Sequence, residues 1–344
     1  MKRTLIALGV IAAAAAPLAA NANPKIYGKM NLAIEKIDAE TNAGVSIEDN
    51  WRVSSYASRF GVRGESELTA TMSAVYGIEW QVNADGDGTD LAQRNRFAGL
   101  KHQDFGTLKL GRVDTYLKLA QGKIDQFNDT KADISDANHG AAAIFAGETR
   151  SANVIDYQSP KIADAITIGV QMIPGEDTGA TAKYDGLADG ISTSVVYDKD
   201  ALFLALAYDK EVAGNNALLG TPAGNSGRRD TLRAAASFKV ADLTLGALYQ
   251  VSELSESIGV TPTTATEETA ALVSAAYKID DVTLKLQYAM AENDAPTAVE
   301  RTRLALGADY AFTSKTKVYG YYTSYEQDRG NESGLFAVGL ETNF

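Results

Sequence analysis

The residues of this sequence that could do chemistry are charged side chains, and they do not form a catalytic set. A Ser-His-Asp hydrolase needs a histidine base, but His102 and His139 lie near no G-x-S-x-G sequence. No cysteine occurs, which excludes disulfides and thiolate metal sites. The stretch from Asp85 to Asp90 resembles a calcium loop superficially, but it lacks the bidentate glutamate and the flanking helices. We therefore expect no enzyme activity, no cofactor and no resident metal, and we interpret this stretch as an exposed acidic loop.

Basic side chains, in contrast, recur on one face of alternating segments. Phe60, Val62 and Phe97 are assigned to the apolar face, and successive side chains of a strand point to opposite faces. A lysine or arginine on the lipid side of a membrane strand costs about 2 to 4 kcal/mol at the bilayer midplane. The opposite face should therefore be a wet interior. The basic residues that this parity turns inward are Lys29, Arg59, Arg63, Arg94 and Arg96, and Arg150 opens the segment after the longest connection.

The longest connection runs from Asp114 to Thr149 and is rich in acids. A structureless loop of this length is uncommon inside a compact domain unless it is functional. Folded into a barrel wide enough for a channel, it would narrow the pore and set carboxylates against the basic wall. The alternative is an extracellular flap with solvated charge. The acidic residues of this connection include Asp125, Asp129, Asp133, Asp136 and Glu148.

Strands must position these residues, because apolar and polar side chains alternate along most of the chain. In Asp281 to Met290, for example, Leu284 and Leu286 share one parity and Lys285 and Gln287 the other. Sixteen such segments occur, at about residues 25–37, 52–65, 68–83, 93–103, 106–113, 150–159, 164–173, 190–198, 201–211, 228–239, 242–254, 267–279, 282–292, 299–312, 315–328 and 333–344. Short turns alternate with longer polar connections, such as Ala39 to Asn50.

An even number of strands, short turns on one side and long loops on the other are typical of a closed outer-membrane barrel. Closure is obligatory there, because hydrocarbon offers no partner to the backbone groups of a sheet edge. Sixteen tyrosines against two tryptophans also fit aromatic girdles at the two interfaces. The alternative is a soluble all-β sandwich or solenoid that buries its apolar face in a core.

The first 22 residues have the features of a secretory signal peptide. Lys2 and Arg3 precede an apolar run from Leu5 to Ala16, and small residues flank the expected cleavage point after Ala22. An uncleaved membrane helix is the alternative, although the run is short for a bilayer span. Residues 23–344 would then form one barrel domain. Removal of Lys2 and Arg3 would take the formal charge from −12 to −14, which disfavours nucleic acid as a partner.

The chain resembles the general diffusion porins of Gram-negative outer membranes. The motifs that carry the resemblance are Tyr27-Gly28-Lys29, residues 56–65 (YASRFGVRGE), residues 94–101 (RNRFAGLK), Leu110-Gly111-Arg112 and the terminal Phe344. Members of that family are sixteen-stranded trimers in which the third loop folds inward to form an eyelet. The resemblance implies an eyelet whose basic side is Lys29, Arg59, Arg94 and Arg150. Arg63 and Arg96, which parity turns inward, and Arg112 are further basic residues expected on the lumen wall.

The acidic side of the eyelet resembles the family less closely. The family's loop often contains Pro-Glu-Phe-Gly-Gly-Asp, where this chain has Asp125-Gln126-Phe127-Asn128-Asp129 without the glycine pair and the glutamate. Asp125, Asp129 and Asp133 are assigned to the acidic side by their neighbourhood. Phe344 resembles the signal read by the outer-membrane assembly machinery, which implies a transient protein partner.

The sequence therefore predicts an all-β, sixteen-stranded antiparallel transmembrane β-barrel with an inward-folded third loop, located in the outer membrane. Its predicted function is passive diffusion of ions and small hydrophilic solutes, and its acidic loops weakly favour cations. The expected surroundings are outer-membrane lipid, lipopolysaccharide and two further copies in a homotrimer. A substrate-specific channel, an outer-membrane hydrolase and an adhesin are the alternatives.

Overall fold

The computed structural model describes residues 24–88, 91–138, 141–179, 184–213, 228–256, 267–294 and 298–344. The predicted signal peptide and His139 lie outside them. The described strands are β1 (Lys25–Thr41), β2 (Ser46–Ser55), β3 (Arg59–Thr69), β4 (Met72–Gln81), β5 (Ala92–His102), β6 (Gly106–Asp114), β7 (Arg150–Gln158), β8 (Ile166–Ile173), β9 (Gly190–Lys199), β10 (Leu202–Ala213), β11 (Arg228–Val240), β12 (Leu243–Glu256), β13 (Glu267–Ile279), β14 (Val282–Asn293), β15 (Glu300–Ala311), β16 (Thr316–Gln327) and β17 (Asn331–Asn343), with one short helix, α1 (Tyr116–Leu119). In this part of the chain, no helix has the length and apolar character needed to cross a membrane.

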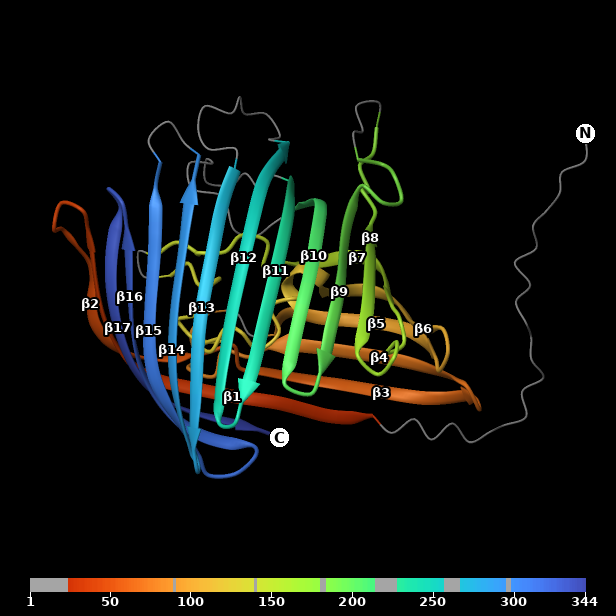
Figure 1. Ribbon diagram of the computed structural model, residues 1–344, viewed down its shortest axis with the longest axis horizontal. Coiled ribbons are helices and arrows are strands. Elements are labelled where there is room, and N and C mark those ends of the chain that lie inside the picture. The colour runs from red at the N-terminus through yellow and green to blue at the C-terminus, as the bar shows by residue number, and fades with distance from the viewer. Residues whose placement is uncertain are drawn as a thin grey trace, which may run out of the picture.

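The strands form one closed antiparallel barrel (Figure 1). Neighbours in sequence pair with one another, and β1 pairs with β17 from Lys29 opposite Asn343 to Thr41 opposite Asn331. The C-terminal part of β1, from Leu32 to Glu40, pairs with β2, and the first residues of β1 pair with β3. The strands β2 and β3 are therefore two halves of one barrel strand. The predicted sixteen-stranded architecture is therefore confirmed, and the ring has no open edge.

The barrel strands turn apolar residues outward and polar or small residues inward. On β14, Leu286 is 51% exposed whereas its neighbour Gln287 is 1% exposed, and on β17 Val338 is 49% exposed whereas Ala337 is fully buried. An exposed apolar face of this extent is what a sheet in contact with hydrocarbon requires. The alternative of a soluble sheet with a buried apolar core does not fit, because the apolar side chains here face away from the interior.

One predicted connection was too long. The sequence suggested a loop from Ala39 to Asn50, but β1 continues to Thr41 and β2 begins at Ser46. Most residues at the start of β2 are exposed whichever face they occupy. Beyond the membrane both faces of a strand meet water, so the apolar alternation disappears there although the backbone pairing continues.

The described part of the connection between β6 and β7, residues 115–149, lies inside the barrel, and we call this connection the β6–β7 loop. Figure 1 shows this segment, in yellow, within the ring of strands. Two apolar clusters join it to the inner wall. Its apolar residues in these clusters are Leu117, Ala120, Ile124, Phe127, Ala132, Ile134, Ile144 and Phe145. Burial of these side chains against alanines, leucines and tyrosines of the inner wall explains why the loop folds inward.

The closing seam of the barrel depends on a glycine. Gly28 and Phe344 exchange backbone hydrogen bonds of 3.2 and 3.1 Å, and a Cβ at Gly28 would lie 2.3 Å from the Phe344 ring and 2.8 Å from the Arg59 carbonyl oxygen. Gly28→Ala should therefore destabilise the barrel by about 1–3 kcal/mol through overpacking, measured by urea unfolding in detergent micelles. Gly320→Ala is the matched control, because its nearest neighbour would lie 3.7 Å away. An equal loss in both variants would contradict this account of the seam.

Candidate pore constriction

Buried arginines of β11 and β15 hold the β6–β7 loop inside the barrel. Arg233 donates to the Leu117 carbonyl oxygen at 3.1 Å and forms an ion pair with Glu148. Arg303 donates to the carbonyl oxygens of Asp133 and Asp136, the latter at 3.0 Å. These contacts satisfy loop carbonyl groups that would otherwise be buried without a partner. Arg233 and Arg303 were not among the residues predicted for the site, although each alternates with apolar residues along its strand.

Two of the three predicted eyelet acids bind the loop backbone, and one of them, Asp125, also accepts a hydrogen bond from Gln287 of β14 at 2.9 Å. Asp125 is 5% exposed and accepts hydrogen bonds from the backbone N–H groups of Phe127 and Ile134 at 2.9 and 3.1 Å. Asp133 is 8% exposed and accepts from the Asp129 N–H at 2.9 Å. Both carboxylates therefore organise the loop backbone, and neither opposes the basic wall as the sequence reasoning expected.

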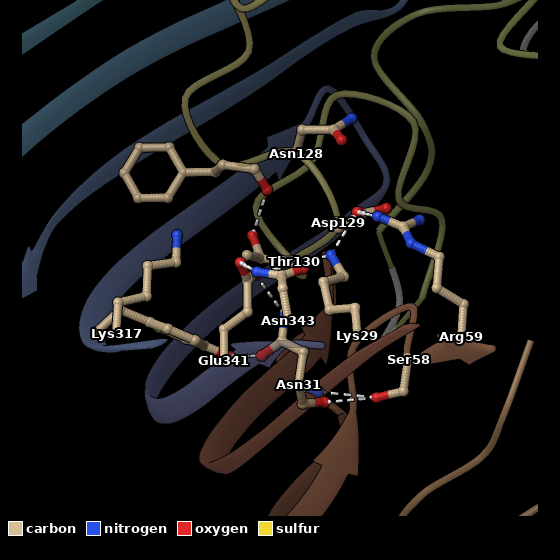
Figure 2. Close-up of polar contacts among 12 residues, drawn as sticks. Lys29, Asn31, Ser58, Arg59, Asn128, Asp129, Thr130, Lys317, Glu341 and Asn343 are labelled. Atoms are coloured by element: carbon tan, nitrogen blue, oxygen red, sulfur yellow. Dashed lines mark hydrogen bonds and ion pairs between the residues drawn. The ribbon is translucent and has the colours of Figure 1, made fainter. Parts of the chain in front are cut away.

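The third predicted acid, Asp129, joins the loop to the basic wall. Lys29 and Arg59 lie opposite one another in the pairing of β1 with β3, and both contact the same Asp129 oxygen, at 2.6 and 2.7 Å (Figure 2). Lys29 also lies 3.7 Å from a carboxylate oxygen of Glu341. Burial alone would raise the pKa of Asp129, but the charges of Arg59 and Lys29 outweigh it and lower that pKa to about 2. Asp129 is therefore ionised at any physiological pH.

A second charged group lies where the loop leaves β6. Arg94 lies 2.5 Å from Glu79. Arg150 lies 3.0 Å from Asp114, and Lys118 of α1 approaches the same carboxylate at 3.4 Å. The structure thus distributes the four predicted eyelet cations over two groups, each with its own carboxylates.

The three other predicted lumen arginines do not share one face. Arg63 faces inward, with its guanidinium 4.8 Å from the centre of the Tyr27 ring. Arg96 lies on the outer face, 5.4 Å from the Trp80 ring, and Arg112 shares that face through its pairing with Arg96. The expectation for Arg96 and Arg112 was wrong. Ile78 of β4 pairs with Arg96 of β5, and Trp80 pairs with Gln93, so β5 has one extra residue between these two pairs. This bulge reverses the inward and outward parity of β5 after Arg94.

The ring of Phe97 accordingly points inward. A Cβ placed on the inward position of Gly77 would lie 2.8 Å from this ring, and the ammonium group of Lys109 lies 5.5 Å from its centre.

The stretch that superficially resembles a calcium loop has a structural contact instead, because Asp85 accepts a hydrogen bond from the Ser55 N–H at 2.7 Å. Among the described residues, no group of three or more His, Cys, Asp or Glu is arranged to hold a metal ion.

Comparison with known proteins identifies the family of the barrel. Residues 7–330 match a family model described as Gram-negative porin. The chain belongs to the Gram-negative porin family. It is similar to the major outer membrane protein P.IB of Neisseria meningitidis serogroup B, with 26% identity over 365 aligned residues that cover all of both chains. The protein is accordingly an outer-membrane porin, a passive channel rather than an enzyme.

Solved porins share the fold of this chain. An anion-selective porin from Comamonas acidovorans aligns with a TM-score of 0.71 and 17% identity. The alignment covers 94% of the present chain and 100% of the Comamonas chain. In vitro folded OmpT of Vibrio cholerae, solved in a trimer form, aligns with a TM-score of 0.65 and 16% identity, over 94% and 99% of the two chains.

The loop of this porin should respond to pH near neutrality. Burial raises the pKa of Asp125, and the charge of Asp133 raises it further, to about 7. A carboxyl group with a raised pKa contributes stability that is fully present below its ordinary pKa and is lost as the pH rises through about 7. Hydrogen exchange of the loop, corrected for its intrinsic pH dependence, should therefore accelerate between about pH 4 and 7 and change little above that range. Asp125→Asn should remove this step, and a step that persists in the variant would assign it to another group.

Proposed function

We propose that ions and small hydrophilic solutes diffuse through the barrel past the β6–β7 loop, which sets the narrowest section beside the basic wall. The observation that carries this proposal is the bridge from Asp129 to Lys29 and Arg59. It ties the loop to the wall that carries the predicted eyelet cations. A fixed loop gives a channel a defined width, whereas an untethered loop would give a fluctuating one.

The charges around this section favour anions. Its five cations are Lys29, Arg59, Arg94, Lys118 and Arg150, and its four carboxylates are Glu79, Asp114, Asp129 and Glu341. Asp125 and Asp133 do not add to the carboxylates because they bind the loop backbone. This balance opposes the weak cation preference suggested by the acidic loops. It also agrees with the structural similarity to an anion-selective porin.

Single-channel conductance in planar bilayers tests the function. A salt gradient should give a reversal potential on the anion side, and liposome swelling should slow smoothly with the size of neutral sugars and amino acids. A sharp preference for one solute class would favour a substrate-specific channel, and a folded barrel without conductance would favour an adhesin. A conducting porin that prefers cations would contradict the anion assignment alone.

We also propose that the porin assembles as a homotrimer in contact with lipid and lipopolysaccharide. The arginines Arg96 and Arg112 on the outer face support this, because arginine on a lipid-facing wall is unfavourable and a neighbouring subunit would cover it. Phe344 is the proposed signal for the assembly machinery, and residues 1–22 are the proposed signal peptide. Gel mobility of the unheated protein against the heated monomer tests the trimer.

A further inference from the structure

We propose that Tyr56 and Tyr321 are positioning residues for the β6–β7 loop, and that the break between β2 and β3 serves to bring Tyr56 inward for this purpose. The inference rests on the proposed role of the loop in setting the pore width. It adds a device in the wall that fixes where the loop lies.

A chain of three hydrogen bonds links the loop backbone to a buried carboxylate. The Lys131 N–H donates to the Tyr321 hydroxyl at 3.1 Å, and Tyr321 donates to the Tyr56 hydroxyl at 3.0 Å. Tyr56 donates to Glu35. A backbone N–H can only donate and a carboxylate can only accept, so each hydroxyl accepts from one side and donates to the other.

The chain is buried along its length. Tyr56 and Tyr321 are each 3% exposed and Glu35 is fully buried. Glu35 also accepts hydrogen bonds from the Ser54 hydroxyl at 2.6 Å and from Arg52 at 2.5 Å. Loss of one hydroxyl would leave a buried group unpaired in a low-dielectric interior, which makes such networks cooperative.

The backbone around Tyr56 departs from regular strand geometry. Ala57 has a φ of +49°, in the left-handed region that residues with a side chain rarely adopt. The groups released by the break find other partners, because the Ser55 N–H donates to Asp85 and the Ser58 hydroxyl accepts from the Asn31 N–H (Figure 2). Strained backbone that its surroundings support in this way is characteristic of functional positions.

The far end of the chain lies beside the bridge to the basic wall. Lys131 follows Asp129 by two residues, and Asp129 itself has a φ of +62°. Between them, the Thr130 hydroxyl donates to the Phe127 carbonyl oxygen at 2.6 Å, and the Phe127 ring lies 5.8 Å from the Tyr321 ring. A fixed Lys131 N–H therefore restricts the one segment that presents Asp129 to Lys29 and Arg59.

The test compares Tyr321→Phe and Tyr56→Phe with the wild-type porin, because both substitutions keep the ring and remove only the hydroxyl. Hydrogen exchange of peptides that contain Lys131 should be about tenfold faster in Tyr321→Phe, and open-channel current noise should increase severalfold. The double variant should exchange no faster than Tyr321→Phe alone, because both hydroxyls belong to one chain. Tyr322→Phe is the matched control on the same strand, since its side chain is outward and 43% exposed.

Glu35→Gln provides a conservative variant, because the amide oxygen still accepts from Tyr56 and should keep exchange near the wild-type rate. Glu35→Leu should accelerate it. Unchanged exchange at Lys131 in Tyr321→Phe, or equal acceleration in Tyr322→Phe, would overturn the proposal. Exchange reports loop position without requiring conductance, so a barrel that responds as expected but conducts nothing would count against the proposed function and not against the positioning chain.

Discussion

The porin in which Arg59 and Arg94 are both replaced by glutamine is expected to have a cation-to-anion permeability ratio about tenfold higher than the wild type. Each guanidinium acts on a passing monovalent ion at roughly 8 Å, where a unit charge in water is worth about 0.5 kcal/mol. This changes the local concentration of each ion about twofold, in opposite directions for cations and anions. Salt in the pore screens part of the effect.

Reversal potentials in planar bilayers under a salt gradient measure this ratio. The substitutions also remove the ion pair of Glu79 with Arg94 and one of the two ion pairs of Asp129, while Lys29 still contacts Asp129, which adds to the shift toward cations. A double variant of two exposed lysines at strand ends, Lys101→Gln with Lys239→Gln, is the matched control for net charge. Unchanged reversal potentials in the arginine variant would remove Arg59 and Arg94 from the constriction.

The second large effect concerns the pair that anchors the end of the β6–β7 loop. The Arg233 side chain is fully buried and that of Glu148 is 2% exposed. Glu148→Gln leaves the guanidinium without its ion-pair partner, although Gln250 and the Leu117 carbonyl oxygen still accept its hydrogen bonds. Removal of one partner of a buried pair is expected to cost about 3–5 kcal/mol of the free energy of unfolding. Urea unfolding of the refolded porin in micelles measures it.

A double variant separates the effect of an unpaired buried charge from the effect of losing the ion pair. Glu148→Gln combined with Arg233→Met leaves no unpaired charge and should be less destabilised than Glu148→Gln alone. Glu65→Gln is the control, because its pair with Lys101 is exposed and contributes about 1 kcal/mol or less. If Glu148→Gln proves no more costly than Glu65→Gln, the loop is held by apolar burial without this ion pair.

The barrel could be predicted from the sequence because lipid on one side and water on the other impose a period of two on every spanning segment. That constraint ends where the membrane ends, so the last residues of β1 and the first residues of β2 were not predicted as strand. It also fails at a bulge. One extra residue in β5 left Arg94 inside and moved Arg96 outside, and nothing in the alternation of residues 92–102 marks the insertion.

The site was predicted only in part, for a different reason. The inward direction of Lys29 and Arg59 could be predicted, because both residues lie on strands whose faces follow from parity. Asp125 and Asp133 lie on irregular backbone, where neighbourhood in sequence does not determine direction. Their carboxylates satisfy loop N–H groups, a requirement that depends on the folded path of the loop.

The pairing of β1 with β17 also constrains how the protein can be made. A chain delivered from its N-terminal side must carry the backbone donors and acceptors of β1 without their final partner until the last strand arrives. Each such group left open to hydrocarbon costs several kcal/mol. An unclosed sheet is therefore not a stable intermediate in the bilayer. A truncated chain that lacks β17 should be degraded by proteases and should not form a smaller conducting pore.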